Sequence, residues 1–418
     1  MDRLRIKGPV RLKGRVVISG AKNAALPAIA AGILTDKPVL LRNVPDVADV
    51  NSTIDLMRYM GAECSFDSDK NILEIDCSDL AKFEAPYDIV RKMRASSLVL
   101  GPLVAKYKKA KVSLPGGCAI GVRPIDLHLK ALSQMGADVR IEHGYVIVDA
   151  KNLKGIRFFF DIVTVTGTEN IMMAAVFAKG TTVLENCAKE PEVVCLAKML
   201  KKMGAKIEGE GTDTIVIQGV KSLKGCEHRL ISDRIEAGTY AVAAAITKGN
   251  ILIENCEVEY FDNVLFKLEE SGAIVERKND SVRVTMKDRP DPFEIITQPY
   301  PGFPTDMQAQ FVALATLANG SSVVKETIFE NRFMHIPELV RMGADIEIKG
   351  NTAHIRGVKR LFGANLMATD LRASAALVLA ALAAEGESFV NRIYHLDRGY
   401  AYLDKKLKAL GADIERIK

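Results

Sequence analysis

The sequence has no long apolar run and no paired cysteines. No segment reaches the ~18 continuous apolar residues that a membrane-spanning helix needs. The opening stretch, MDRLRIKGPVRLKG, lacks the apolar centre of a secretory signal peptide. The seven cysteines are scattered and form no Cys-x-x-Cys pair, which argues against a disulfide framework and a zinc site. We therefore predict a cytoplasmic protein without membrane association or bound metal.

Nucleotide-binding and nucleic-acid-binding motifs are missing as well. The segment GGCAIG lacks the GxxxxGK pattern of a phosphate-binding loop, and no dinucleotide fingerprint follows a predicted strand. Charge is nearly balanced, with 57 basic and 52 acidic side chains and a net charge of +5. This mild excess suits small anionic substrates, whereas nucleic acid normally needs a concentrated basic face. We expect no nucleic-acid partner.

An internal repeat dominates the 418 residues, a length that suggests two or three domains. Six times, a Gly-Ala step ends an amphipathic helical stretch and begins an extended one, as in LAKMLKKMGAKIE. A glycine there suits a left-handed helix C-cap. The repeated glycines, spaced 68–75 residues apart, are Gly61, Gly136, Gly204, Gly272, Gly343 and Gly411.

Each repeat also holds an alanine-rich helix, such as AVAAAITKG, whose small residues on every face predict burial. The unit reads strand, helix, strand, helix, hairpin, which is an α/β arrangement. The last copy lacks one hairpin strand, and the opening LRIKGPVRLKG resembles that strand in other copies, so the N-terminal strand should complete the sixth unit. This predicts two three-unit domains, residues 22–230 and residues 1–21 with 231–418.

The loops before the alanine-rich helices carry chemically distinctive residues. Helix N-termini already attract anions, so cations there are unfavourable unless an anion is bound. The ordinary alternative is a helix-end ion pair, such as Asp370 with Arg372 or Asp233 with Arg234. The residues at nearly equivalent places are Lys22, Arg94, Thr168, Arg234, Asp306 and Arg372.

A second loop, PGGCAIGVRP, places Cys118 after two glycines and close to Arg123 and the helix-starting Pro124. A thiol before a helix start and near a guanidinium can have a depressed pKa, and the thiolate is the reactive form. An idle thiol is the alternative. His128 and His335 lie near helix starts without metal-ligand partners, and we expect them to be cap or surface residues. Together these features predict an enzyme for a multiply anionic, phosphorylated substrate, with the reaction left open.

Six segments carry a specific resemblance that runs nearly end to end: PGGCAIGVRPIDLH, SGAKNAALP, FPTDMQAQF, ENRFMH, ATDLRASAALVL and IYHLDRGY. In these the chain closely resembles the UDP-N-acetylglucosamine enolpyruvyl transferase family. The resemblance implies a two-domain inside-out α/β barrel of six β-α-β-α-β-β units. It also implies transfer of the enolpyruvyl group of phosphoenolpyruvate to the 3′-hydroxyl of UDP-N-acetylglucosamine, with release of phosphate. These two small molecules would be its partners, and no cofactor or obligate protein partner is implied.

The resemblance also implies roles for residues at matching positions. Cys118 would add to phosphoenolpyruvate, act as general acid and be alkylated by fosfomycin, and Asp306 would be the base. Lys22, Arg123 and Arg398 would hold the phosphate, and domain closure would bring Cys118 and Lys22 against Asp306 and Arg398. The other substrate-binding residues would be Asn23, Arg94, Pro124, Ile125, Asp126, Leu127, Thr164, Ile328, Arg332 and Arg372.

Two departures and two alternatives accompany this resemblance. Some relatives have lysine where this chain has Ala48 and Ile162, so we expect altered nucleotide contacts there. The shikimate-pathway enolpyruvyl transferases share the fold and chemistry but lack the PGGC loop. A non-enzymatic six-unit ring around DNA should line its inner helices with cations, whereas these helices are alanine-rich.

Overall fold

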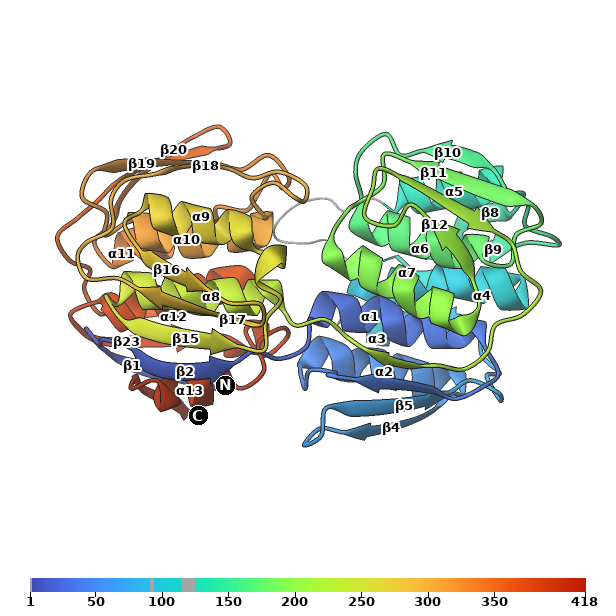
Figure 1. The fold of residues 1–418 in the computed structure, drawn as a ribbon, viewed down its shortest axis with the longest axis horizontal. Coiled ribbons are helices and arrows are strands. Elements are labelled where there is room, and N and C mark those ends of the chain that lie inside the picture. The colour runs from blue at the N-terminus through green and yellow to red at the C-terminus, as the bar shows by residue number, and fades with distance from the viewer. Residues whose placement is uncertain (1, 91–93, 115–124) are drawn as a thin grey trace. The chain divides into compact units, whose positions relative to one another are not determined.

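The computed structural model describes residues 2–90, 94–114 and 125–418. Two compact units divide the chain (Figure 1). The split unit contains the chain up to Ser19 together with Ser232–Lys418, and the continuous unit lies between Gly20 and Ile231. Within the described residues, no helix combines the length and apolarity needed to cross a bilayer.

Each unit is built from three four-stranded sheets. In the split unit the strands are β1 (Arg3–Gly8), β2 (Lys13–Val17), β15 (Asn250–Glu254), β16 (Ile274–Arg277), β17 (Ser281–Thr285), β18 (Glu294–Ile296), β19 (Ser321–Lys325), β20 (Asp345–Lys349), β21 (Thr352–Arg356), β22 (Asn365–Met367), β23 (Gly386–Asn391) and β24 (Asp413–Ile417). In the continuous unit they are β3 (Val39–Arg42), β4 (Glu63–Asp67), β5 (Ile72–Asp76), β6 (Glu84–Ala85), β7 (Lys109–Ser113), β8 (Asp138–Glu142), β9 (Tyr145–Asp149), β10 (Arg157–Phe159), β11 (Thr181–Glu185), β12 (Lys206–Glu208), β13 (Thr214–Gln218) and β14 (Glu227–Arg229).

Each unit also contains helices, some in its interior and some partly exposed. Those of the split unit are η3 (Val258–Tyr260), α8 (Arg234–Ile246), α9 (Asp262–Glu270), η4 (Thr305–Met307), α10 (Gln308–Ala315), α11 (Ile336–Arg341), α12 (Leu371–Ala383), η5 (Ile393–His395) and α13 (Leu403–Ala409). Those of the continuous unit are α1 (Lys22–Ala31), η1 (Gly32–Leu34), α2 (Ala48–Met60), α3 (Tyr87–Val90), η2 (Arg94–Val99), α4 (Leu100–Tyr107), α5 (Asp126–Gln134), α6 (Val165–Ala175) and α7 (Pro191–Met203).

The repeat predicted from the sequence is confirmed in the strand pairing. β18 runs parallel to β19, and the hairpin β20–β21 returns antiparallel against β19, so the sheet order is β18-β19-β21-β20. In the split unit, α8, α10 and α12 pack against one another in the centre, with the sheets outside (Figure 1). Every residue of α8 is buried, because alanine and other small side chains let helices and sheets approach it from all sides. This is the expected inside-out α/β barrel.

The six repeated glycines have the predicted backbone conformation. Their φ angles lie between +92° and +107°, as at Gly61 and Gly204, which follow α2 and α7. A side chain would be strained at such angles, so glycine ends each helix without cost and turns the chain into the hairpin.

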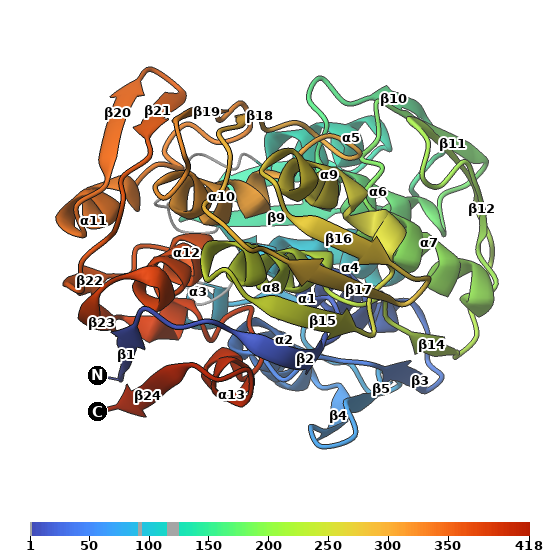
Figure 2. The ribbon, with the colours of Figure 1, turned by 60° about the vertical axis from the view of Figure 1, so that its left-hand side comes forward.

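The N-terminal strand completes the sixth sheet, as predicted. β1 lies between β23 and β24, with Leu4 opposite Val390 and Arg3 opposite Ile417, and the two chain ends are neighbours (Figure 2). β2 pairs with β15 in the split unit, and the chain then enters the continuous unit at α1. β14 pairs with β3 in the continuous unit, and the chain returns at α8.

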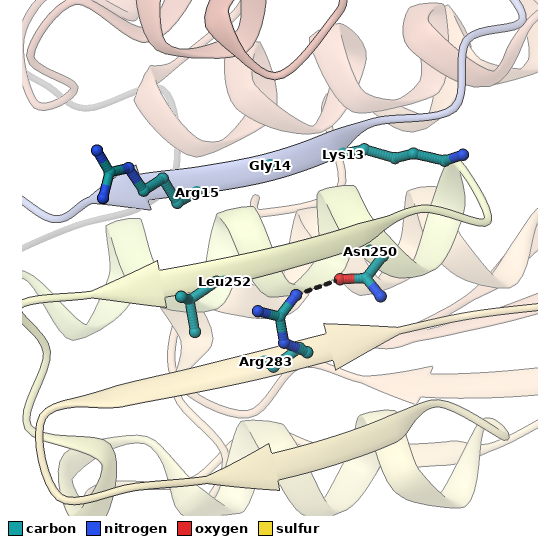
Figure 3. A pocket seen from close by; sticks show the side chains of 6 residues that line it. All are labelled: Lys13, Gly14, Arg15, Asn250, Leu252 and Arg283. Carbon is teal, nitrogen blue, oxygen red and sulfur yellow. Dashed lines mark hydrogen bonds between the residues drawn. The ribbon is translucent and has the colours of Figure 1, made fainter.

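The outer sheet faces carry the polar residues. On the sheet β16-β17-β15-β2, Val16, Ile251 and Val284 point inward and are buried. The opposite face forms an open hollow over β2, β15 and β17, in which the Arg283 Nη1 donates to Asn250 Oδ1 at 2.7 Å (Figure 3). The residues that line the hollow are Lys13, Gly14, Arg15, Asn250, Leu252 and Arg283.

Candidate functional site

An aspartate and two arginines meet where core helices of the split unit begin. Asp306 lies in η4, which leads into α10, Arg372 is the second residue of α12, and Arg332 lies between β19 and α11. Arg332 Nη2 donates to Asp306 Oδ1 at 2.6 Å. Arg372 donates to Asp306 Oδ2 through Nη2 at 2.8 Å and through Nε at 3.1 Å. Three of the expected site residues therefore form one cluster.

The two arginines of the cluster are more deeply buried than the aspartate. The Arg332 and Arg372 side chains are 4% and 3% exposed, whereas the Asp306 side chain is 25% exposed. Burial alone would raise the pKa of Asp306, but Arg372 and Arg332 outweigh it and hold that pKa well below its ordinary value. Burial opposes the charge of Arg372, and Asp306 more than restores it, so the pKa of Arg372 is raised. Asp306 is therefore a stable carboxylate in this arrangement.

Within the described part of the chain, each arginine has one nitrogen donor that makes no hydrogen bond. Arg332 Nε and Arg372 Nη1 are buried and have no hydrogen-bond acceptor among the residues that the structure describes. A buried donor without an acceptor costs about 1–3 kcal/mol, so such groups usually have a functional explanation. Two unmet guanidinium N–H groups beside one carboxylate suit an anionic ligand.

Gln310, one helical turn after Asp306, belongs to a set of buried polar side chains. Gln310 Nε2 of α10 donates to Thr239 Oγ1 of α8 at 3.2 Å, and Thr239 Oγ1 lies 2.9 Å from Tyr400 Oη. The Arg372 guanidinium stands 5.3 Å from the centre of the Tyr400 ring. These hydrogen bonds link α8 and α10 to Tyr400, whose ring lies beside Arg372. Tyr400 ends the segment IYHLDRGY, but nothing in the sequence assigned it a role of its own.

The helix-end ion pair proposed for Arg372 is wrong. Asp370 accepts from the backbone N–H groups of Arg372 and Ala373 at 2.9 and 3.0 Å, so its carboxylate is an N-cap. The Arg372 guanidinium turns to Asp306 instead. Asp233 likewise caps α8, and Arg234 stands 5.5 Å from the centre of the Tyr300 ring.

The continuous unit holds other residues named from the sequence. Lys22, the first residue of α1, donates to Asp49 Oδ2 in the first turn of α2 at 3.2 Å, and Asn23 follows it half-buried. Asp49 was not anticipated from the sequence. Thr164 caps α6 by accepting from Gly167 N at 3.2 Å. Ile125, Asp126 and Leu127 form the start of α5, with only Leu127 buried. Ala48 begins α2, and Ile162 is exposed before α6.

The other expected site residues are described only in part or lie outside the described residues. Cys118, Arg123 and Pro124 fall in 115–124 and are not described, and for Arg94 only the backbone, at the start of η2, is. Arg398 lies half-buried in the turn after η5, close enough to lower the pKa of His395 alongside the larger effect of burial. Ile328 is exposed in the segment between β19 and Arg332.

Four of the cysteines within the described residues are unsuited to nucleophilic chemistry. Burial raises the pKa of Cys64 to about 11 and the pKa values of Cys77, Cys187 and Cys256 to about 12. Such thiols hold almost no thiolate near neutral pH, so they are inert. In the same part of the chain, no group of three or more His, Cys, Asp or Glu residues is arranged to hold a metal ion.

The expectation that the two histidines are cap or surface residues is wrong for His128 and only partly right for His335, which occupies the N-cap position of α11. His128 and His335 are 2% and 0% exposed, so neither is a surface residue, and His335 makes no side-chain cap bond to α11. Asn170 Nδ2 donates to His128 Nδ1 at 3.0 Å, which requires a neutral ring with Nδ1 as the acceptor. Burial lowers the pKa of both rings to about 4. Proximity to a helix start did not reveal that other elements cover these side chains.

His128 should make stability depend on pH. Its folded pKa of about 4 lies below the ordinary 6.5, so as pH falls the unfolded chain takes up the proton first. The free energy of unfolding should therefore fall from pH 6.5 to pH 4, by about 1.4 kcal/mol per pH unit for one histidine. His128→Asn keeps an acceptor for Asn170 but cannot titrate, so in urea unfolding it should lower this slope by the contribution of one histidine, while His335 continues to titrate. An unchanged slope would show that the ring is already protonated in the folded state.

Full-length comparisons place this architecture among known proteins. Residues 6–407 match the family model described as EPSP synthase (3-phosphoshikimate 1-carboxyvinyltransferase). The enolpyruvyl transferase NikO from Streptomyces tendae is similar in structure, with a TM-score of 0.90, 27% identity and coverage of 100% of this chain and 99% of that one. EPSP synthase from Acinetobacter baumannii shares the fold at a TM-score of 0.78 and 19% identity, with both chains fully covered. The architecture is the enolpyruvyl transferase fold.

The curated relatives narrow this class. UDP-N-acetylglucosamine 1-carboxyvinyltransferase from Geobacter metallireducens is 56% identical over 418 residues, covering all of both chains. The enzyme of the same name from Koribacter versatilis is 54% identical over 419 aligned positions, covering all of this chain and 97% of the relative. The chain belongs to the UDP-N-acetylglucosamine 1-carboxyvinyltransferase family.

Proposed function

We propose that this protein transfers the enolpyruvyl group of phosphoenolpyruvate to the 3′-hydroxyl of UDP-N-acetylglucosamine and releases phosphate. The observation that carries the proposal is identity of 54–56% to enzymes of that name along the whole chain. The Asp306–Arg332–Arg372 cluster supports it, because two buried cations with unmet donors suit an anionic substrate. We assign the reaction to the cytoplasm, as a step in peptidoglycan precursor synthesis, and infer that fosfomycin inhibits it.

The reaction is an addition followed by an elimination. The sugar hydroxyl loses a proton and bonds to C2 of phosphoenolpyruvate while the methylene carbon gains a proton. That carbon then loses a proton as the bond to the phosphate oxygen breaks, which restores the double bond. An acid and a base are therefore needed, and we assign Cys118 and Asp306 to these roles. Lys22, Arg123 and Arg398 hold the phosphate.

The remaining assignments concern binding. Arg332 and Arg372 hold the substrate carboxylate, Asn23 contacts the sugar, and Ile328 is assigned to substrate binding. The residues assigned to the nucleotide are Arg94, Arg123, Pro124, Ile125, Asp126, Leu127 and Thr164.

The ion pairs of Asp306 explain how its basicity is controlled. With both arginines bound to it, Asp306 has a strongly lowered pKa and is a weak base. A substrate carboxylate that draws Arg332 and Arg372 toward itself weakens these interactions, so the pKa of Asp306 rises. The base then becomes effective only when phosphoenolpyruvate is present, which limits unproductive proton transfer.

Phosphate release tests the proposed function. Purified protein with phosphoenolpyruvate should release phosphate when UDP-N-acetylglucosamine is added and should not do so with shikimate 3-phosphate. The product should equal the sugar nucleotide plus the enolpyruvyl group by mass spectrometry. Phosphate release that depends on shikimate 3-phosphate alone would assign the chain to the other enolpyruvyl transferases.

A further inference from the structure

The hydroxyl hydrogen of Thr305, the residue before Asp306, points in one fixed direction. Thr305 Oγ1 accepts from Arg332 Nη1 at 2.8 Å and donates to Glu326 Oε2 at 2.8 Å. A hydroxyl has one hydrogen, a guanidinium only donates and a carboxylate only accepts, so the proton must point to Glu326. The lone pairs of Thr305 therefore face Arg332.

Glu326 is anchored independently of Thr305. Its side chain is buried after β19, and the residue is 3% exposed. Oε1 accepts from Thr297 Oγ1 at 2.9 Å and from the backbone N–H groups of Ile328 and Phe329 at 2.7 and 3.2 Å. One carboxylate thus holds the start of the segment that carries Arg332 and, through Thr305, the segment that carries Asp306.

Arg332 is held on both terminal nitrogens by consecutive residues. Nη1 binds Thr305, Nη2 binds Asp306, and the guanidinium stands 5.3 Å from the centre of the Phe329 ring. Because the guanidinium is a rigid plane, fixing its two terminal nitrogens also fixes where Nε points. Nε is the atom of Arg332 that has no acceptor among the described residues.

We propose that Thr305 and Glu326 are positioning residues for phosphoenolpyruvate. Glu326 orients the Thr305 hydroxyl, and the hydroxyl holds Arg332 at the angle that serves the substrate carboxylate. When the substrate draws Nη2 from Asp306, the Thr305 bond still holds Nη1, so Arg332 pivots about a fixed point. This inference rests on the proposed function, since it takes phosphoenolpyruvate as the ligand of Arg332.

Thr305→Val and Thr305→Ser form a matched pair for testing this role. Valine has nearly the shape of threonine without the hydroxyl, and serine keeps the hydroxyl. Thr305→Val should raise the KM for phosphoenolpyruvate at least tenfold and leave the KM for UDP-N-acetylglucosamine within twofold, whereas Thr305→Ser should stay within threefold of the unsubstituted protein in both. Thr316→Val removes a buried hydroxyl at the far end of α10 and serves as the control, with both values unchanged.

Glu326→Gln provides a second test that keeps the hydrogen bonds from Thr297, Ile328 and Phe329. Its amide oxygen can still accept from Thr297, Ile328 and Phe329, but an NH₂ group now faces Thr305 and cannot accept its proton. The KM for phosphoenolpyruvate should rise at least fivefold with the melting temperature nearly unchanged. Equal changes in the KM of both substrates, or a loss of stability alone, would make Thr305 and Glu326 purely structural and overturn the inference.

Direct binding separates this inference from the proposed function. Calorimetry with phosphoenolpyruvate alone needs no turnover, so the Kd ratio of Thr305→Val to unsubstituted protein can be measured even if no phosphate is released. A ratio of ten or more without phosphate release would overturn the proposed reaction and support the positioning role. A ratio near one with normal phosphate release would support the proposed reaction and overturn the positioning role. Failure of the unsubstituted protein to bind phosphoenolpyruvate would overturn both.

Discussion

Asp306→Asn should lower kcat by about 10²–10⁴-fold, the usual range for loss of a general base. The amide keeps the shape of the side chain but cannot take the proton of the sugar hydroxyl. Affinity for phosphoenolpyruvate should not fall and should increase severalfold, because the substrate no longer competes with a carboxylate for Arg332 and Arg372. Phosphate release and calorimetry on the same preparation measure the two effects.

Stability provides a third measurement on this variant. Without Asp306 two buried guanidinium groups lack their counter-ion, and breaking a buried pair in this way is strongly destabilising. The melting temperature should therefore drop, and phosphoenolpyruvate should restore more of it than it adds to the unsubstituted protein. Asp345→Asn, which removes an exposed partner of Arg356, should change neither kcat nor stability appreciably. A raised KM with normal kcat would reassign Asp306 to binding.

Cys118→Ala should reduce phosphate release by at least about 10³-fold, because the methylene carbon then has no proton donor. The fold should be unaffected, as judged by circular dichroism and melting temperature. The control is Cys226→Ala, which removes a half-buried thiol whose pKa burial raises, and which should leave activity unchanged. Normal phosphate release from Cys118→Ala would remove the assigned role.

Cys118→Asp distinguishes an acid from a nucleophile. A carboxylic acid can still protonate carbon, so this variant should keep measurable activity. It should lose covalent inactivation by an epoxide such as fosfomycin, because that reaction needs the thiolate. Inactivation at the rate of the unsubstituted protein would mean that another side chain reacts with the epoxide.

The architecture was largely predictable because the signals for it are local and repeated. A glycine at each helix C-cap and an alanine-rich helix in each repeat depend only on neighbouring residues, and six copies make them unmistakable. Even the long-range pairing of β1 with β24 followed from the likeness of the N-terminal strand to hairpin strands elsewhere in the chain.

The site was less predictable because its contacts are not local. Asp370 and Asp306 were both available partners for Arg372, and the sequence favoured the nearer one. Capping of α12 decides the matter, since it uses Asp370 and leaves the guanidinium to reach across 66 positions to Asp306. Thr305 and Glu326 are common residue types, so only their hydrogen bonds distinguish them. His128 shows the same limit, because its burial depends on α6.

The position of β1 and β2 also constrains the order of folding during synthesis. These strands leave the ribosome well before their partners, because β2 must wait for β15, and β1 must wait for β23 and β24. The continuous unit has all its strands once Arg229 has been made, so it can fold while synthesis continues. The split unit, with its Asp306 cluster, is therefore finished last. β1 therefore stays without its sheet partners while the whole continuous unit is made.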